Sequence, residues 1–368
     1  MTETARPAPL LTALCGALVV AATTTGAITS AAEPPQNILL YKGADRQQRL
    51  IDGAKKEGAV VIYEAMIVNQ AMRPLAAAFE KKYPFIRLTY WRADTEDIVQ
   101  KAAAEVRAKN IVVDVVEGTG AGEQAARADV LQPFYSPEFA AYPQQYLDPK
   151  GMWASTRISY YSAAYNTRLV PPAQMPKTYE ALLDPRWNGK MAWRIGTDSG
   201  CDLFITNLRL AWGNDRALAY LQKLKKQNII NFGAGSARTL VDRVIAADYP
   251  IALNIFAHHP LISKAKGAPV DSQLLDPVPA TASTVGIVRG TAHPNAAMLL
   301  ADFILSPDGQ QILSRAGYFP ADPTVPPRAA QMSVVPKNVG LHENFIGPDK
   351  LLKYTDSSQD IFRRLFER

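Results

Sequence analysis

The chain's four histidines are the first residues to consider for chemistry, and His258 and His259 are adjacent. Neighbouring imidazoles can suggest a metal site. Adjacent side chains on a strand point to opposite faces, however, so two histidines there do not readily share one ion. No H-E-x-x-H or C-x-x-C motif accompanies them. The pattern favours one histidine in a cleft and one packed or solvated, and predicts no metal site.

Two glycine-containing segments fall short of known catalytic or cofactor motifs. Gly118, Gly120 and Gly122 follow an expected strand, but Glu123 stands where a dinucleotide-binding fingerprint needs its third glycine. Ser236 lacks the glycine two positions earlier that a nucleophile elbow requires, and it fits a helix N-cap better. We therefore expect no cofactor and no enzyme activity. A secreted hydrolase whose catalytic residues are distant in sequence stays open as the rival class.

Polar and aromatic residues recur where expected strands end and helices begin. Ligands of open α/β sheets bind beyond the carboxyl ends of the strands, and helix N-termini there offer N–H groups to anions. For any one residue a turn or capping role is an equal alternative, but their recurrence favours a ligand-binding cleft. The candidates are Tyr63, Glu64, Trp91, Arg92, Glu117, Thr119, Asp198, Ser199, Ser236, Arg238, Phe256 and His258.

Three kinds of contact are expected within this set. The predicted roles are aromatic cover over the ligand from Tyr63 and Trp91, donors to anionic groups from Arg92 and the helix starts near Ser199 and Ser236, and acceptors for donors or a cation at Glu117 and Asp198. The net charge of +6 comes from scattered residues without a run of five Lys or Arg. It allows a mild attraction to anions and does not indicate a nucleic-acid groove.

Alternating strands and helices must position these residues. Strands at 59–63, 85–91 and 111–116 alternate with helices at 69–83 and 94–109, a β-α-β-α-β order typical of an open parallel sheet. The later part of the chain continues in the same style. It predicts strands at 190–195, 250–256 and 285–289, and helices at 202–212, 215–226, 236–247, 295–305 and 307–316, and the tail at 351–366 ends in another amphipathic stretch.

The length and the N-terminus indicate a two-domain exported protein. A chain of 368 residues exceeds what a single core usually supports. An apolar run at 10–22, too short to span a bilayer comfortably, precedes small residues ending at Ala32, so residues 1–32 are predicted to be a cleaved signal peptide. Leu14 before Cys15 does not suit a lipid-attachment box, although lipidation stays open. Cys201 alone then remains, so the core rather than a disulfide must hold the fold.

Several short segments together are identified with one family. Residues 183–190, LDPRWNGK, resemble the L-x-D-P-x-W-x-G-K segment of periplasmic substrate-binding proteins of ABC importers, in the extracellular solute-binding family 1 group that includes the ferric-ion binders. Each similar segment is weak alone, but seven occur in sequence order over most of the chain. The others are AFEKKYP at 78–84, AYNT at 164–167, GAPV at 267–270, HPNAA at 293–297, SPDGQQ at 306–311 and AGY at 316–318.

The resemblance implies the type II periplasmic-binding-protein fold, which has two α/β lobes, each an open sheet flanked by helices, with the ligand cleft between them. Lobe one is expected at 33–160 plus 275–315, lobe two at 161–274, and a C-terminal extension at 316–368 packing on the lobes. It also implies hinge closure around a small-molecule solute. A monomer in the periplasm would then deliver the solute to a membrane permease and its ATPase.

The ferric-ion members of this group use two adjacent tyrosines, and the resemblance places Ala257 and His258 at those positions. The pair Tyr160 and Tyr161 precedes the crossover strand and is expected to pack there instead. The chain thus resembles the family in its sequence segments but lacks the two tyrosines that bind iron, which favours an organic or oxyanionic solute. A ferric-ion binder with a non-standard ligand set stays open as the alternative.

Overall fold

A computed structural model describes residues 37–195, 200–233 and 235–367. The predicted signal peptide at 1–32 and the predicted site residues Asp198 and Ser199 lie outside these described residues. Among the helices within them, none combines the length and apolarity needed to cross a bilayer.

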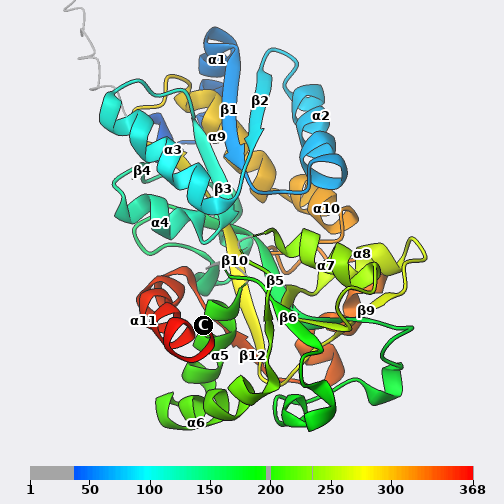
Figure 1. Ribbon diagram of the computed structural model, residues 1–368. Coiled ribbons are helices and arrows are strands. Elements are labelled where there is room, and N and C mark those ends of the chain that lie inside the picture. The colour runs from blue at the N-terminus through cyan, green and yellow to red at the C-terminus, as the bar shows by residue number, and fades with distance from the viewer. Residues whose placement is uncertain (1–36, 196–199, 234, 368) are drawn as a thin grey trace, which may run out of the picture. The chain divides into compact units, whose positions relative to one another are not determined.

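Two mixed sheets share one long strand, β5 (Ala154–Asn166), which crosses from one to the other (Figure 1). We call the first sheet with its helices lobe one and the second lobe two. The strands of lobe one, besides the first half of β5, are β1 (Ala59–Glu64), β2 (Arg87–Arg92), β3 (Val115–Thr119), β4 (Leu131–Gln132), β10 (Val278–Val288), β11 (Phe319–Pro320) and β12 (Glu343–Phe345). Those of lobe two are β6 (Met191–Trp193), β7 (Ile230–Asn231), β8 (Ile251–Phe256) and β9 (Val270–Gln273).

The strand order is β2-β1-β3-β10-β5-β8-β6-β7. The strands β2, β1 and β3 are parallel, and β10 runs antiparallel between β3 and β5. The predicted β-α-β-α-β unit is therefore confirmed. Its register places Tyr63 beside Trp91, and Glu64 beside both Arg92 and Glu117.

Helices cover the sheets of both lobes (Figure 1). Those of lobe one are α1 (Arg46–Glu57), α2 (Arg73–Lys82), α3 (Thr95–Ala108), α4 (Ala121–Arg127), α9 (Pro294–Leu305) and α10 (Pro307–Arg315). Those of lobe two are α5 (Cys201–Trp212), α6 (Asn214–Leu224), α7 (Ala237–Ile245), α8 (His258–Lys264) and α11 (Pro348–Phe366). Shorter helical turns lie at Ile38–Leu40, Val68–Met72, Pro137–Ala141, Gln144–Tyr146, Pro172–Gln174, Glu180–Leu183, Pro185–Trp187, Lys225–Gln227, Ala329–Val334 and Pro336–Val339.

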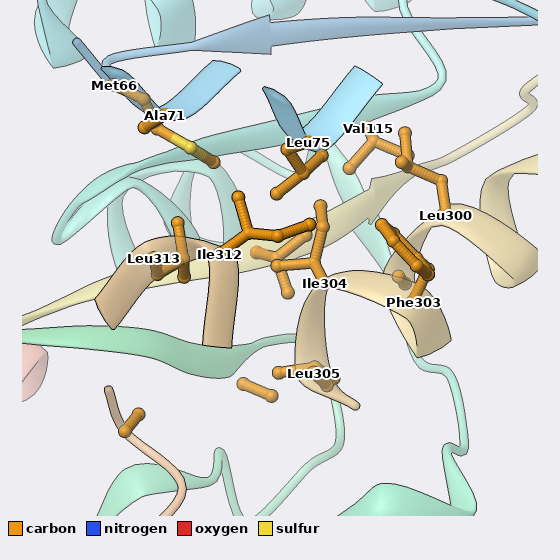
Figure 2. Close-up of a cluster of buried hydrophobic side chains, with 14 of the residues drawn as sticks. Met66, Ala71, Leu75, Val115, Leu300, Phe303, Ile304, Leu305, Ile312 and Leu313 are labelled. Atoms are coloured by element: carbon orange, nitrogen blue, oxygen red, sulfur yellow. The ribbon is translucent and has the colours of Figure 1, made fainter. Parts of the chain in front are cut away.

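The apolar helix α9 forms the centre of the core of lobe one. Figure 2 shows its Leu300 and Phe303 facing Leu75 of α2 and Val115 of β3, with Ile312 of α10 alongside. Each of these five residues is at most 6% exposed. Burial of each large apolar side chain contributes about 1.5–3 kcal/mol, so this layer holds β1 and β3, and hence their polar last residues, in place.

The C-terminal helix α11 packs on α5 of lobe two. The hydroxyl groups of Thr206 and Ser358 lie 2.8 Å apart and join the two helices. Phe362 and Phe366 contact Trp193 at the end of β6, with ring centroids 5.9 and 4.7 Å away. The end of β6 therefore has aromatic support from the tail of the chain.

The clearest differences from the prediction concern three segments. The strand expected at 111–116 is β3 at Val115–Thr119, because pairing with β1 begins only at Val115. The strand expected at 285–289 is part of the longer β10, which pairs with β3, β5 and β12. His258 and His259 lie not on a strand but in the first turn of α8, so the argument from alternating strand faces does not apply to them.

Candidate functional site

Residues of both lobes line a cavity of about 350 Å3. Lobe one contributes the chain after β1, the end of β2, the start of α3, the end of β3 and the first half of β5. Lobe two contributes residues beside β6, the start of α7, the end of β8 and the start of α8. The residues around the cavity are Ala65, Met66, Ile67, Val68, Arg92, Asp94, Thr95, Thr119, Arg157, Ser159, Arg194, Ser236, Ala237, Arg238, Phe256, His258, His259 and Tyr318.

Arg157, on β5, is the buried cation of this cavity. Its side chain is 4% exposed and donates a hydrogen bond to Oε1 of Glu117. Its guanidinium group also lies 4.7 Å from the ring centroid of Tyr318. Thr156 donates to the same Glu117 oxygen over 2.7 Å. The carboxylate and the ring fix the orientation of the guanidinium group, which presents N–H donors in a planar fork suited to oxyanions.

Three further arginines reach the cavity from other elements. Arg92 ends β2, and its guanidinium lies 3.7 Å from the Asp94 carboxylate. Arg194 follows β6 and donates from Nε to the carbonyl of Gly235 over 2.9 Å. Arg238 in the first turn of α7 forms an ion pair with Asp242 on the outer side. Cationic groups thus face the cavity from both lobes, which favours an anionic ligand.

His258 and His259 both line the cavity and are 3% and 8% exposed. The expectation that only one of them lies in a cleft is therefore wrong. Their rings lie 4.5 Å apart, edge to face. Burial, followed by the charge of Arg238, lowers the pKa of His259 to about 3, and burial above all lowers the pKa of His258. Both imidazoles are neutral near pH 7, and neither ring nitrogen of His258 has a hydrogen-bond partner among the described residues.

Ser236 begins α7 at the edge of the cavity. Its side-chain oxygen accepts a hydrogen bond from the N–H of Thr239 over 3.2 Å, so the predicted N-cap is present. An N-cap hydroxyl leaves other N–H groups of the first helical turn unbonded, and these suit an anion. Ser236 therefore caps the helix and also lines the cavity.

Six of the ten predicted site residues that the structure describes line the cavity. They are Arg92, Thr119, Ser236, Arg238, Phe256 and His258. Glu117 and Thr119 lie within β3 rather than beyond its end. Of the residues that line the cavity, Thr119 has its hydroxyl group hydrogen-bonded to that of Ser283 over 3.1 Å. The ring centroids of Phe256 and His258 lie 5.6 Å apart.

Tyr63 and Trp91 do not line the cavity, so their predicted role as aromatic cover is corrected. Their rings contact each other, 5.0 Å between centroids, on the face of the sheet that α3 covers. The hydroxyl of Tyr63 donates to Glu105 of α3 over 2.7 Å, and burial, followed by that carboxylate, raises the Tyr63 pKa to about 12. Glu64 and Arg92 are the next residues on the same strands, and successive residues of a strand point to opposite faces.

Glu64 and Glu117 lie beneath the cavity rather than on its surface. Both are fully buried. Glu64 accepts a hydrogen bond from the N–H of Met66, and Glu117 accepts from Thr156 and Arg157. Direct contact of either carboxylate with a ligand is therefore corrected to a supporting position behind the lining residues.

Sequence reasoning missed Arg157, Arg194, Ser159 and Tyr318. Arg194 directly follows a short apolar strand, which is the same signal that identified Arg92. Arg157 stands inside the otherwise uncharged segment ASTRISYYSAAYN. A lone arginine in a fully buried strand needs a partner or a ligand, so this residue could have been found. Tyr318 comes close only through the tertiary fold.

Acidic and sulfur ligands do not gather here in the manner of a protein metal centre. Within the described ranges, no three His, Cys, Asp or Glu residues are placed to hold a metal ion. Tyr318 is the tyrosine among the described lining residues. Its hydroxyl accepts from the N–H of Ile67 over 2.8 Å, and burial raises its pKa. The arrangement can bind oxyanions and hydroxyl groups, and it offers no paired tyrosinates.

Solved structures share this architecture at low sequence identity. Iron-bound HitA from Pseudomonas aeruginosa is 18% identical with a TM-score of 0.70, covering 84% of this chain and 99% of that one. AfuA from Actinobacillus pleuropneumoniae, solved with fructose-6-phosphate, is 20% identical with a TM-score of 0.67, covering 83% and 99%. The chain therefore has the type II periplasmic-binding-protein fold, as its sequence segments implied.

Sequence comparison gives the same group. An Fe(3+)-binding periplasmic protein of Serratia marcescens is 23% identical over 270 residues, which are 71% of this chain and 77% of that protein. Residues 109–338 match the family of bacterial extracellular solute-binding proteins. With more than half of its length matched, the chain belongs to the bacterial extracellular solute-binding protein family.

Proposed function

We propose that this protein captures a small oxyanionic organic solute between its lobes and delivers it to the permease of an ABC importer. The observation that carries the proposal is the set of four arginines, Arg92 and Arg157 from lobe one and Arg194 and Arg238 from lobe two, around one cavity. Asp94 is the carboxylate among the described lining residues. Charge-assisted hydrogen bonds from arginine to carboxylate or phosphate contribute about 1.5–3 kcal/mol each.

The two buried imidazoles favour an organic solute over a simple inorganic anion. A neutral imidazole has one donor and one acceptor nitrogen, and His258 satisfies neither within the described structure. A hydroxyl group can both accept and donate. A hydroxylated carboxylate or a phosphorylated sugar would therefore match both the arginines and the imidazoles, and a solved relative holds fructose-6-phosphate.

Free ferric ion fits this cavity less well. Fe(III) is a hard cation that favours anionic oxygen ligands. Tyr160 donates its hydroxyl to Glu343, and Tyr161 bonds to Thr281, so both are engaged outside the cavity. Burial raises the pKa of Tyr160. These tyrosines are poor candidates for tyrosinate ligands in the cavity.

A second candidate is an iron carrier with a different ligand set. The names of the relatives from Serratia and Pseudomonas favour it, as do the unpartnered nitrogens of His258. In that case the arginines would hold an anionic chelator around the metal.

The remaining features of the proposal follow from the solute-binding role. We expect export to the periplasm with removal of residues 1–32, action as a monomer, and binding without turnover. Residues 33–160 with 275–315 and residues 161–274 would move as lobes around β5 and β10.

Titration calorimetry with metal-free protein tests the proposal. The panel contains malate, sulfate, glucose-6-phosphate, glucose, ferric citrate and ferric nitrilotriacetate. We expect binding of at least one organic anion, no binding of glucose, and no product in the recovered ligand. Replacement of Arg238 by Met should weaken anion binding about 10–150-fold. The matched control is Arg243→Met on the same helix, outside the cavity and paired with Asp248, which should bind normally. Transfer of iron to the protein from ferric citrate or ferric nitrilotriacetate, without binding of any organic anion, would contradict the proposal.

A further inference from the structure

Two carboxyl groups lie side by side under the cavity floor. Glu64, the last residue of β1, is the register partner of Glu117 on β3. Register partners on neighbouring parallel strands are about 5 Å apart and project to the same face. Both residues are fully buried, so both carboxyl groups are shielded from bulk solvent.

Each carboxyl group has one oxygen with hydrogen-bond donors and one without. Glu64 accepts from the N–H of Met66, and Glu117 accepts from Thr156 and Arg157. Glu64 Oε1 and Glu117 Oε2 are buried and have no partner among the described residues. A buried acceptor without a donor costs about 1–3 kcal/mol. A proton on Glu64 Oε1 would turn an unpartnered acceptor into a donor on the same face of the sheet as Glu117.

The charges around the pair do not neutralise two carboxylates. From β5, Arg157 is fully buried and pairs with Glu117. At the end of β2, Arg92 is half exposed and is shared with Asp94 before α3. Two neutral groups also lie nearby: Tyr318 under Arg157, and His258 on α8, which packs against Tyr318 at 5.0 Å. Burial, partly offset by the Met66 N–H, and then the charge of Glu117 raise the Glu64 pKa to about 7.

We propose that Glu64 is the proton-binding member of this carboxyl pair, and that it takes up a proton when an anionic solute binds at Arg157. The inference rests on the proposed function, because the solute must be an anion. Arg157 connects the two sites: it contacts Glu117 below and lines the cavity above. An anion bound on the outer side of Arg157 offsets the positive charge that stabilises the two carboxyl groups. A negative charge on Glu64 beside Glu117 then becomes less favourable, so Glu64 binds a proton more readily.

Linkage fixes the direction of the effect. If binding takes up a proton, the association constant is highest when Glu64 is already protonated. The association constant falls as pH rises, by up to about tenfold per pH unit. This fall occurs in the pH range between the pKa of the proton-binding group in the free protein and its pKa in the bound protein. Solute capture would thus be strongest on the acidic side of neutrality.

The test combines a ligand-free measurement with a binding measurement. Infrared spectroscopy of the ligand-free protein at about pH 6 should show the C=O stretch of buried protonated carboxyl groups, to which Asp202 also contributes. The part contributed by Glu64 should be lost by about pH 9, missing in Glu64→Gln and retained in Asp202→Asn. Calorimetry with sulfate and with malate, whose charges stay constant over this range, should show proton uptake in buffers of different ionisation enthalpy. Glu64→Gln should bind these anions without proton uptake and with little dependence on pH, because its amide can donate permanently to Glu117.

Asp202→Asn is the matched control. Asp202 is also a buried carboxyl group, with its pKa raised by burial to about 6, but it does not line the cavity. This variant should keep the proton uptake. Anion binding without proton uptake, or uptake that persists in Glu64→Gln, would overturn the inference and leave the proposed function intact. Absence of binding by both anions and by the organic panel would overturn the proposed function, and the coupling with it.

Discussion

Arg157 reaches Glu117 across an intervening strand. The two residues lie on β5 and β3, and β10 runs between them, pairing with both. Ser283, the register partner of Arg157 on β10, has a small side chain that leaves room for the guanidinium group. The result is a buried ion pair whose arginine lines the cavity and lies on β5, the strand that the two sheets share.

Removal of Arg157 should cost both stability and binding. Arg157→Met leaves Glu117 buried without its cation, beside Glu64, which we expect to destabilise the protein by about 3–5 kcal/mol. The double variant Glu117→Gln/Arg157→Met removes the isolated charge and should recover much of this loss without restoring anion binding. Urea unfolding and calorimetry on both variants measure the two effects separately. If Arg157→Met is as stable as the wild type, the ion pair does not hold the site.

Arg92 should act on binding with little effect on stability. Its side chain is 45% exposed at the cavity, so Arg92→Ala removes a charge-assisted contact of about 1.5–3 kcal/mol with the solute. The melting temperature should change little, because half-exposed residues contribute little to the core. Arg87→Ala, at the exposed start of the same strand, is the control and should bind normally. Unfolding of Arg92→Ala would identify Arg92 as structural, and normal binding would place the solute elsewhere.

Glu64 should make the protein less stable as pH rises. Its folded-state pKa of about 7 lies above its ordinary value of 4.5, so the native state holds a proton that the unfolded chain releases between these values. This contribution to stability is complete below about pH 4.5, is lost as pH rises to about 7, and amounts to at most about 3 kcal/mol. Glu64→Gln should therefore gain stability relative to the wild type between about pH 4 and pH 8 in urea unfolding. If the difference in unfolding free energy between Glu64→Gln and the wild type is the same at about pH 4 and pH 8, the raised pKa is contradicted.

Binding should bring the lobes together. The arginines come from both lobes, and β5 is the strand that the two sheets share, so a solute that contacts both sets stabilises a closed arrangement. Small-angle scattering should give a smaller radius of gyration with saturating malate or glucose-6-phosphate, whichever binds. Arg238→Met should reduce this change at the same concentration. A bound solute that leaves the scattering unchanged would argue against closure.

Local sequence patterns predicted the elements well where hydrophobic period and caps agree. Residues 295–305 were expected as a strongly apolar helix and form α9, and Ser236 was expected as an N-cap and is one. The position of β3 was missed because strand pairing with β1, rather than the apolar run at 111–116, decides where it begins.

The candidate site was predictable only in part, for geometric reasons. Proximity to a strand end identified Arg92, but Tyr63 and Trp91 share that proximity and face the other side of the sheet. Successive residues of a strand point to opposite faces, so only one residue of Tyr63–Glu64 on β1 and one of Trp91–Arg92 on β2 could face the cavity. The contacts of Arg157 with Glu117 and Tyr318 join segments far apart in sequence, and no local pattern indicates such a contact.

Native mass spectrometry of protein freshly isolated from producing cells tests the central claim most directly, because a closed cleft can retain its solute through purification. The account predicts one bound organic anion per chain that is lost on unfolding, with a much lower occupancy in Arg157→Met. One ferric ion per chain, without an organic component and retained in Arg157→Met, would contradict it.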